Sequence, residues 1–370
     1  MTAWARWTAA EIGTIVAAGQ WRRIRDFDAL GPEGVLTETG EKVVSFASND
    51  YLGLTAHPAV IAAAHGALDL WGAGAGAARL IVGSRPVHTE LERELAAWKR
   101  CQQALLFPTG FAANLGVLST FGGPGVLVCS DELNHASIVD GCRMARAETA
   151  VYRHGDVDHL DALLAGTARA IVVTDTVFSM DGDAAPLDAL IEVCRRRGAL
   201  LVLDEAHAVL GPDPDLDGVD VLRVGTLSKA LASLGGFVAG PAPFIDLLAN
   251  RARSFIFTTA SPPAAVAAAR AALRIVRSAE GDALRARLRA AIDEVRPGHA
   301  TPIVPVVLGD EGAALAAAGE LLRRGLLVPA IRPPTVPPGT ARLRIALSAA
   351  HTAEQVGRLV EALDDLGFGA

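Results

Sequence analysis

Short runs of apolar residues alternate with helical stretches through the middle of the chain. Each run holds four to six apolar residues, lies between turn-forming residues and ends on polar ones. This pattern is typical of buried strands in a mostly parallel sheet that has helices on both faces. The chain is therefore predicted to be an α/β protein. The runs are Gln103–Pro108, Gly125–Asp131, Arg169–Ser179, Gly198–His207, Asp220–Lys229 and Gly235–Gly240.

The two ends of the chain follow other patterns. Near the N-terminus we expect a helix over Thr8–Phe27 and a small strand pair that turns at Thr39–Glu41. An Ala-rich helical stretch is expected from Pro263 to about Val295. These patterns divide the chain into an N-terminal arm (1–45), a large domain (46–265) and a small C-terminal α/β domain (266–370).

The C-terminal domain is predicted from two apolar runs and two helical stretches. A proline-rich segment, Pro333–Pro338, predicts a stiff exposed loop between them. The runs are Ile303–Leu308 and Leu343–Leu347, and the helices are Glu311–Arg323 and Thr352–Leu366.

Composition excludes several classes of protein. The net charge of −7 and the pI of about 5.7 argue against a surface that coats nucleic acid. The sequence has no apolar run long enough to span a membrane and no recognisable signal peptide. The four cysteines form no Cys-x-x-Cys pair, which argues against a zinc site or a disulfide framework. We therefore expect a cytoplasmic protein without a metal.

Reactive side chains cluster at the ends of the predicted strands, where an open parallel sheet binds its ligands. A lysine there, Lys229, has an amine that can form an imine with a carbonyl cofactor. The preceding hydroxyls, Thr226 and Ser228, are suited to a phosphate. Asp204 supplies the carboxylate that pyridoxal phosphate (PLP) needs at its ring nitrogen, and His207 is placed to reach the ring hydroxyl.

Each of these residues also has an ordinary structural explanation. An isolated lysine is usually a solvated surface residue, and Asp204 after a strand is a common helix N-cap. His135 can stack on a cofactor ring, but it can equally be a satisfied core or capping histidine. The pair Gly110–Phe111 opens a predicted helix, which suits a phosphate, although such turns also occur without ligands.

Seven motifs in order then resemble one family, the α-oxoamine synthases. The resemblance implies fold type I PLP-dependent transferases, which condense an amino acid with an acyl-CoA, lose CO₂ and act as homodimers with sites at the interface. The motifs are Ser48–Leu54 (SNDYLGL), Gly110–Asn114 (GFAAN), Leu133–Ser137 (LNHAS), Val177–Asp183 (VFSMDGD), Asp204–His207 (DEAH), Gly225–Gly236 (GTLSKALASLGG) and Ile331–Thr352.

Within the family, IRPPTVP at Ile331–Pro337 and the compact length look most like members that join L-alanine to a pimeloyl thioester of CoA or acyl carrier protein, in biotin synthesis. A member that joins glycine to acetyl-CoA, or another α-oxoamine synthase, is the alternative. A catalytically silent partner subunit is a more distant one, and the joint presence of Lys229, Asp204, His207 and His135 argues against it.

The resemblance also implies roles for individual residues. Lys229 holds the cofactor as a Schiff base and moves the α-proton, and it forms the catalytic set with His135, Asp204 and His207. Arg344 is the expected partner of the amino acid carboxylate. Cofactor contacts are implied for Gly110, Phe111, His135, Ser179, Asp204, His207, Thr226, Lys229 and, from a second subunit, Thr259; substrate contacts are implied for Arg22, Asn49, Arg332, Thr335 and Arg344.

One segment departs from the family pattern. Where the family has a glycine-rich stretch after the Asp-His motif, this chain reads AVLGPDPDLDGVD (Ala208–Asp220), which is shorter and acidic. The entrance for the acyl group is therefore expected to differ here, which leaves the preferred acyl chain open.

Overall fold

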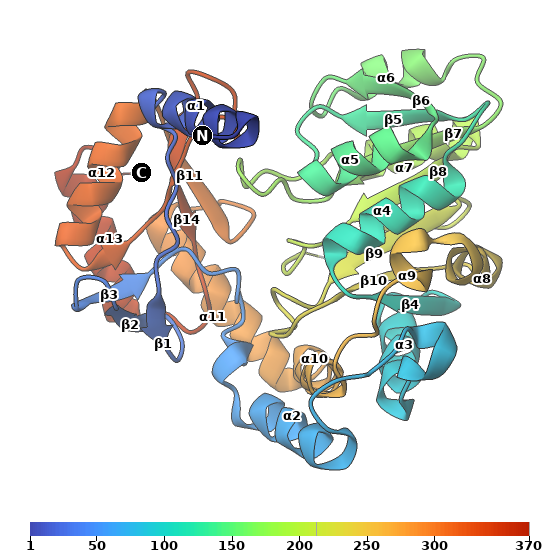
Figure 1. Ribbon diagram of the computed structural model, residues 1–370, viewed down its shortest axis with the longest axis horizontal. Helices are drawn as coiled ribbons and strands as arrows, with labels where there is room; N and C mark the ends of the chain where they lie inside the picture. The colour runs from blue at the N-terminus through green and yellow to red at the C-terminus, as the bar shows by residue number, and fades with distance from the viewer. Residues whose placement is uncertain (212, 370) are drawn as a thin grey trace.

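The computed structural model describes residues 1–211 and 213–369. It has two lobes, one built on a seven-stranded sheet and the other on sheets of three and four strands (Figure 1). Helices α2 (Pro58–Trp71) and α10 (Pro263–Val276) pack against each other below the two lobes.

The large sheet is mostly parallel, as predicted. Only β10 runs against its neighbours, β4 and β9, while β9, β8, β7, β5 and β6 are parallel. In spatial order the strands are β4 (Gln103–Phe107), β10 (Gly236–Gly240), β9 (Val221–Thr226), β8 (Leu200–Asp204), β7 (Ala170–Asp175), β5 (Leu127–Asp131) and β6 (Glu148–Tyr152).

Helices cover both faces of this sheet, which explains the continuous apolar runs. In β7, Ile171 and Val173 pack into one buried cluster and Val172 into another on the opposite face. The first cluster includes side chains from α4 (Gly110–Phe121), α5 (Ala136–Ala145), α8 (Ala242–Arg251) and α9 (Arg253–Ile256); the second includes α6 (Val157–Leu164) and α7 (Leu187–Arg197). Another helix, α3 (Pro86–Trp98), contacts β4 and β10.

The edge strand β6 has no counterpart among the predicted strands. Buried and exposed side chains do not alternate along it, and only Tyr152 of its five residues is buried. Backbone pairing to β5 holds this strand, and because most of its side chains lie outside the core it needs no apolar run, unlike β4 at the other edge of the sheet.

The second lobe contains the C-terminal segment. Its three-stranded sheet is antiparallel, and its helices lie where they were predicted to within a residue or two. The sheet has the order β11 (Ile303–Gly309), β14 (Ala341–Ala346) and β13 (Ala330–Ile331), and the helices are α12 (Glu311–Arg323) and α13 (Ala353–Asp365).

The predicted N-terminal strand pair is present, and it extends into this lobe. Its second strand pairs with β12, so the N-terminal segment shares a sheet with C-terminal residues. The strands are β1 (Phe27–Ala29), β2 (Glu33–Leu36), β3 (Glu41–Ser45) and β12 (Leu326–Leu327). The division of the chain at residues 45 and 265 stays a prediction.

Two predicted helices were wrong in their bounds. The first, α1, covers Ala3–Ala17 instead of Thr8–Phe27, because Gly19 with φ of +67° ends it in a left-handed turn. The Ala-rich stretch is two helices, α10 and α11 (Ala279–Val295), which part at Arg277 and Ser278.

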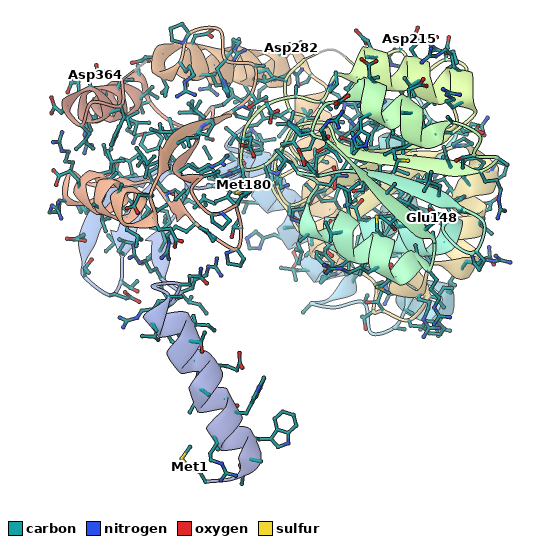
Figure 2. All side chains as sticks on the ribbon, turned by 90° about the horizontal axis from the view of Figure 1, so that it is seen from above. Met1, Glu148, Met180, Asp215, Asp282 and Asp364 are labelled. Carbon is teal, nitrogen blue, oxygen red and sulfur yellow. The ribbon has the colours of Figure 1, made fainter. Side chains whose placement is uncertain are left out.

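Helix α1 projects from the body of the molecule, with Met1 at its tip (Figure 2). None of its residues is buried, and Trp4 and Trp7 are largely exposed. Among the residues described, no helix combines the length and the apolar character needed to cross a bilayer.

Candidate active site

A chain of polar contacts starts at Lys229, in the loop that follows β9. Its Nζ lies 2.8 Å from Nε2 of His207, and Nδ1 of His207 lies 2.6 Å from the hydroxyl of Tyr51. That hydroxyl donates to Oδ1 of Asn49 at 3.0 Å. Tyr51 has one proton to give, so all these contacts are hydrogen bonds only when His207 carries its proton on Nδ1. Nε2 of His207 is then free to accept from the amine of Lys229.

The surroundings keep these groups in their uncharged forms. Burial lowers the pKa of Lys229 to about 8, although the charges of Asp204 and Asp175 act the other way. Burial, followed by the positive charges of Lys229 and Arg344, holds the pKa of His207 well below its usual range. Burial raises the pKa of Tyr51 to about 12. The site therefore offers a neutral amine beside a neutral imidazole once the pH is above about 8.

Two buried carboxylates stand side by side at the ends of neighbouring strands. Asp204 ends β8 and Asp175 ends β7, and the two are paired in register. Asp204 accepts from the side chain of Asn114 at 2.6 Å and from the backbone N–H of Ala206 at 2.9 Å. Among residues 205–211 and 213–220 no helix follows Asp204 before the next strand, β9, so the N-cap explanation of this residue is wrong. Among residues 1–211 and 213–369 it forms no ion pair, which leaves its buried charge suited to a pyridinium nitrogen.

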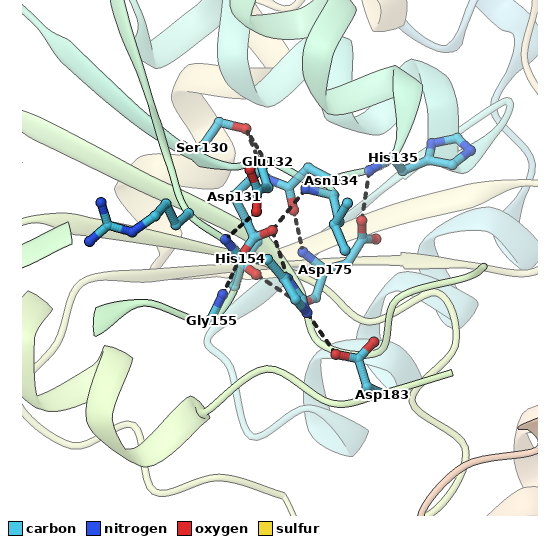
Figure 3. A network of polar contacts seen from close by, with 12 residues as sticks. Ser130, Asp131, Glu132, Asn134, His135, His154, Gly155, Asp175 and Asp183 are labelled. Carbon is cyan, nitrogen blue, oxygen red and sulfur yellow. Dashed lines mark hydrogen bonds and ion pairs between the residues drawn. The ribbon is translucent and has the colours of Figure 1, made fainter. Parts of the chain in front are cut away.

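The second carboxylate, Asp175, was missed by sequence analysis and holds His135 in place. Its Oδ2 accepts the backbone N–H of His135 at 2.7 Å (Figure 3). Burial and the charge of Asp204 raise the pKa of Asp175 well above its usual range. His135 is also the N-cap of α5, so the capping explanation is correct for this residue. Its ring lies edge to face with Phe111, and burial lowers its pKa.

Arg344, on β14 of the second lobe, reaches the same site. Its Nη2 donates to Oδ1 of Asn49 at 3.1 Å, and its Nε donates to the backbone carbonyl of Ser179 at 2.5 Å. The side chain is buried. It therefore presents a fixed guanidinium fork, the geometry that binds a carboxylate through two hydrogen bonds.

The first turn of α4 lies against the end of β9. A Cβ atom on Gly110 would lie 3.5 Å from Cβ of Thr226, and one on Gly236 would lie 2.6 Å from the backbone nitrogen of Gly110. Thr109 caps the helix through the N–H of Ala112. The approach at Gly110 is ordinary contact, whereas at Gly236 only a glycine lets β10 come this close to the start of α4. The N-terminus of α4 and Thr226 together form a cradle that is suited to a phosphate.

The predicted substrate residues Arg22, Arg332 and Thr335 form a separate group. Arg22 donates to the hydroxyl of Thr335 at 3.3 Å, and Arg332 donates to the carbonyl of Gly19 at 2.5 Å. A cavity of about 440 Å³ adjoins Thr335, between the proline loop and the loops at the ends of β5 and β7. Asn134 and Ser179 line it too, so it reaches the edge of the Lys229 site.

Thr259 lies away from both groups. It is exposed and forms an isolated bridge with Ala78. Phe257 beside it and the segment Leu80–Val82 are exposed and apolar. Within a single chain, Thr259 forms no hydrogen bond with Lys229 or Thr226 in the part that the structure describes.

The acidic segment Ala208–Asp220 is tied to the sheet by buried charges. Asp213 pairs with Arg223 of β9 at 2.8 Å, and Arg223 pairs with Glu205 at 2.6 Å. Lys99 contacts the other oxygen of Glu205 at 2.7 Å. Pro212 of this segment lies outside the described residues. The shorter loop is therefore anchored on the face of the sheet that Glu205 occupies.

Several polar residues of the site escaped sequence analysis. Tyr51 lies inside the SNDYLGL motif, and from the sequence its aromatic ring could equally well have been an ordinary core side chain. Asn114 and Asp175 are polar residues in mostly apolar elements, and that is the signal that could have found them. No described group of three or more His, Cys, Asp or Glu residues could hold a metal ion.

Comparisons with known proteins agree with this geometry. The model of the family "Aminotransferase class I and II" matches residues 41–363. A protein from Anaeromyxobacter dehalogenans named 8-amino-7-oxononanoate synthase is 51% identical, and the match covers 96% of this chain and 94% of that protein. One of the same name from a Methylobacterium species is 47% identical, with 98% and 97% covered.

Solved structures give the same assignment. Serine palmitoyltransferase from S. paucimobilis, with a bound PLP–myriocin aldimine, is 31% identical with a TM-score of 0.90, and the match covers 99% of this chain and 100% of that one. An 8-amino-7-oxononanoate synthase from Francisella tularensis has a TM-score of 0.74 at 26% identity, with 88% and 98% covered. The matched model, the relatives and the shared fold lead to one conclusion: this chain belongs to the aminotransferase class I and II family.

Proposed function

We propose that this chain is a PLP-dependent acyltransferase that condenses L-alanine with a pimeloyl thioester to give 8-amino-7-oxononanoate, CO₂ and the free thiol, a step of biotin biosynthesis. The observation that carries the proposal is the position of the Lys229 amine, 2.8 Å from His207 and at the same end of the sheet as the buried carboxylate of Asp204. The 51% identity to a protein with that name selects this reaction within the family.

The residues at the sheet edge fit the cofactor. When bound, PLP supplies a ring that withdraws electrons from the amino acid and stabilises negative charge at its α-carbon. Asp204 would face the ring nitrogen, and His135 would lie on the ring face. His207 and Ser179 would lie near the ring hydroxyl. Gly110, Phe111 and Thr226 would hold the phosphate, since the start of α4 and Thr226 form the cradle described above.

The amino acid side of the reaction depends on Lys229 and Arg344. Arg344 binds the carboxylate of alanine through two hydrogen bonds and so fixes the α-carbon. The neutral Nζ of Lys229 takes the proton from that carbon, and His207 orients the amine through its Nε2. The α-carbon then bonds to the carbonyl carbon of the thioester, and the thiolate leaves and takes a proton from water. The alanine carboxylate departs as CO₂, and the ammonium of Lys229 returns its proton to the α-carbon.

The acyl chain is assigned to the cavity beside the proline loop. Its volume of about 440 Å³ is sufficient for an extended chain of seven carbons, and Thr335, which lines it, accepts a hydrogen bond from Arg22. The guanidinium of Arg22 suits the distal carboxylate of a pimeloyl group, which an acetyl group lacks. Arg332 holds the carbonyl of Gly19 and so keeps the segment before Arg22 in place.

We further propose a cytoplasmic homodimer in which Thr259 reaches the phosphate of the partner's cofactor. Thr259 is exposed, and exposed apolar residues surround it at Phe257 and Leu80–Val82. A surface of this kind is usually covered by another protein chain. Sedimentation at several protein concentrations tests whether the chain forms a dimer. Thr259→Val should weaken cofactor binding while the protein remains a dimer.

The deciding experiment is release of the thiol from acetyl-, succinyl-, pimeloyl- and palmitoyl-CoA with alanine, glycine or serine. We expect the highest kcat/KM for alanine with pimeloyl-CoA. A preference for glycine with acetyl-CoA would refute the assignment of substrates while leaving the family intact. Absence of a visible absorbance band in purified protein supplied with PLP, with Lys229→Ala identical to wild type, would refute the cofactor.

A further inference from the structure

His154 joins two loops that the reaction uses, yet it contacts none of the residues assigned to catalysis. It follows β6, and its Nδ1 lies 3.0 Å from Oδ1 of Asp131, the last residue of β5. Its Nε2 lies 2.7 Å from Oδ2 of Asp183 (Figure 3). The ring is half-buried and meets the ring of Phe178 edge to face, with the centroids 4.4 Å apart.

The two carboxylates fix the protonation state of this ring. A carboxylate accepts hydrogen bonds, and a neutral imidazole has only one N–H to donate. Both contacts of His154 are therefore satisfied only when the ring is the doubly protonated imidazolium. Partial burial opposes this charge, but the hydrogen bonds to Asp183 and Asp131 outweigh it and raise the pKa of His154.

The other charged groups around His154 are also compatible with a positively charged ring. Glu132 lies in the loop after β5 and accepts the backbone N–H of His154 at 2.9 Å. Arg153, the neighbour in sequence, is turned to Asp156 and pairs with it at 2.6 Å. The charges that face the ring, from β5 and from the Asp183 loop, are therefore negative and favour the imidazolium.

Asp131 anchors the loop that delivers His135. Its carboxylate accepts the N–H of Leu133 at 2.9 Å and that of Gly155 at 3.0 Å, in addition to the imidazolium. The same loop supplies His135, whose backbone is held by Asp175. Loss of the His154 imidazolium would therefore alter the hydrogen bonds of Asp131, which holds the turn that positions His135.

Asp183 belongs to the loop that holds Arg344. In this loop the carbonyl of Ser179 accepts from Arg344, Asp181 pairs with Arg342, and the carbonyl of Gly182 accepts the hydroxyl of Thr301 at 2.5 Å. These three contacts all come from the C-terminal lobe. Through Asp183, the same loop also contacts His154, and His154 in turn contacts Asp131 at the end of β5 in the large sheet.

We propose that His154 is a positioning residue whose imidazolium clamps the Ser179–Asp183 loop to the end of β5, so that Arg344 and His135 keep their places around the amino acid. Only the expected change in the KM for alanine rests on the function proposed above. The clamp requires a charged ring, so it loosens when the pH rises through the pKa of His154 and the imidazolium loses a proton.

The test uses the holoenzyme, with His154→Gln as the principal variant. Glutamine keeps one amide NH₂ group but carries no charge, and its oxygen can only accept, so one of the two carboxylates loses its donor and one of the two loops is released. We expect faster hydrogen exchange in peptides covering 177–184. The KM for alanine should rise about tenfold, and the KM for the acyl thioester should rise less, because the same loop lines only one wall of the acyl cavity. In wild type, kcat/KM for alanine should fall above the pKa of His154, and this inflection should be absent from the variant.

Two further variants complete the experiment. His65→Gln changes an exposed histidine of α2 and serves as the matched control, with wild-type exchange and KM expected. Asp183→Asn removes one negative charge while retaining an acceptor, so it should lower the pKa of His154. That pKa is read directly from the ¹⁵N chemical shifts of the ring, which needs no substrate.

Three results would overturn the proposal. These are a neutral His154 ring at pH 6, unchanged exchange of residues 177–184 in His154→Gln, or equal increases in KM for both substrates. If the enzyme turns over another amino acid, the KM of that amino acid replaces the KM of alanine. The shift and exchange measurements then still decide the role of His154 on their own.

Discussion

The amine of Lys229 and the imidazole of His207 lie 2.8 Å apart, although 22 residues separate them in the chain. Burial brings the pKa of Lys229 down to about 8 and that of His207 well below its usual range, so the pair is uncharged under mildly alkaline conditions. Only a neutral amine attacks a carbonyl or accepts a proton. This contact therefore sets the pH range in which the site can act.

Incorporation of the cofactor should follow the titration of Lys229. Below a pH of about 8 the amine is protonated, so the rate of PLP attachment to the apoprotein should rise about tenfold per pH unit and level off above it. Stopped-flow absorbance at several pH values measures this rate. A plateau reached only near pH 10.5, the ordinary pKa of lysine, would contradict it. Lys229→Ala should show no attachment at any pH.

The pair of buried carboxylates predicts opposite effects for two substitutions of Asp175. Its raised pKa means that the folded state binds a proton more tightly than the unfolded chain, so Asp175 makes stability fall as the pH rises above about 4. Asp175→Asn cannot ionise and should unfold at higher urea than wild type at pH 8. Asp175→Ala leaves the N–H of His135 without its acceptor and should lose about 1–3 kcal/mol.

Urea unfolding of the apoprotein at pH 5 and pH 8 checks both substitutions. The advantage of Asp175→Asn over wild type should be smaller at pH 5, where the carboxyl of wild type is closer to its neutral form. If the two proteins show the same pH dependence, the carboxyl of Asp175 is not the group that carries it.

The fixed fork of Arg344 predicts a specific defect in amino acid binding. Arg344→Lys keeps the charge but loses the second hydrogen bond to a carboxylate, so KM for alanine should rise about 10- to 100-fold. The KM for the acyl thioester provides the internal control and should stay within about twofold, because the acyl chain lies elsewhere. An unchanged KM for alanine would assign its carboxylate to another residue.

The neighbouring arginines Arg22 and Arg23 form a natural matched pair. Arg22 contacts Thr335 beside the acyl cavity, whereas Arg23 forms no hydrogen bond or ion pair with residues 1–211 or 213–369. Arg22→Ala should raise KM for pimeloyl-CoA about tenfold and leave KM for palmitoyl-CoA, which has no distal carboxylate, unchanged. Arg23→Ala should behave as wild type. The reverse ranking would place Arg23 at the acyl end.

The close approach at the start of α4 predicts that Gly236 is needed for cofactor binding. A Cβ there would lie 2.5 Å from the carbonyl oxygen of Thr109 and 2.6 Å from the nitrogen of Gly110, so Gly236→Ala must displace the turn that forms the cradle. The dissociation constant for PLP, measured by fluorescence titration, should rise at least about tenfold. Gly74→Ala, where nothing lies within 4 Å, is the control and should bind normally.

Much of the fold followed from the order of residues. Strands such as β7 and β8 are buried on both faces, so their apolar runs predicted both their existence and a mostly parallel sheet. Strand β6 left no such run because only one of its five side chains is buried, although β4, at the other edge, is buried and was predicted. The end of α1 was misplaced for a local reason, since Gly19 ends the helix although apolar residues continue beyond it.

For the site, the sequence by itself determined which reactive groups are present and that they stand at strand ends, including Lys229, Asp204 and His207. Tertiary structure decided which of them meet. The strand order sets β7 beside β8 and thereby places Asp175 next to Asp204, and the packing of the two lobes brings Arg344 to Asn49. Tyr51 and His207 are 156 residues apart in the chain, and His154 and Asp183 are 29 apart. No short stretch of sequence could therefore indicate that these side chains meet. A hydrogen bond depends on distances within about 3 Å, and only the folded backbone fixes those distances.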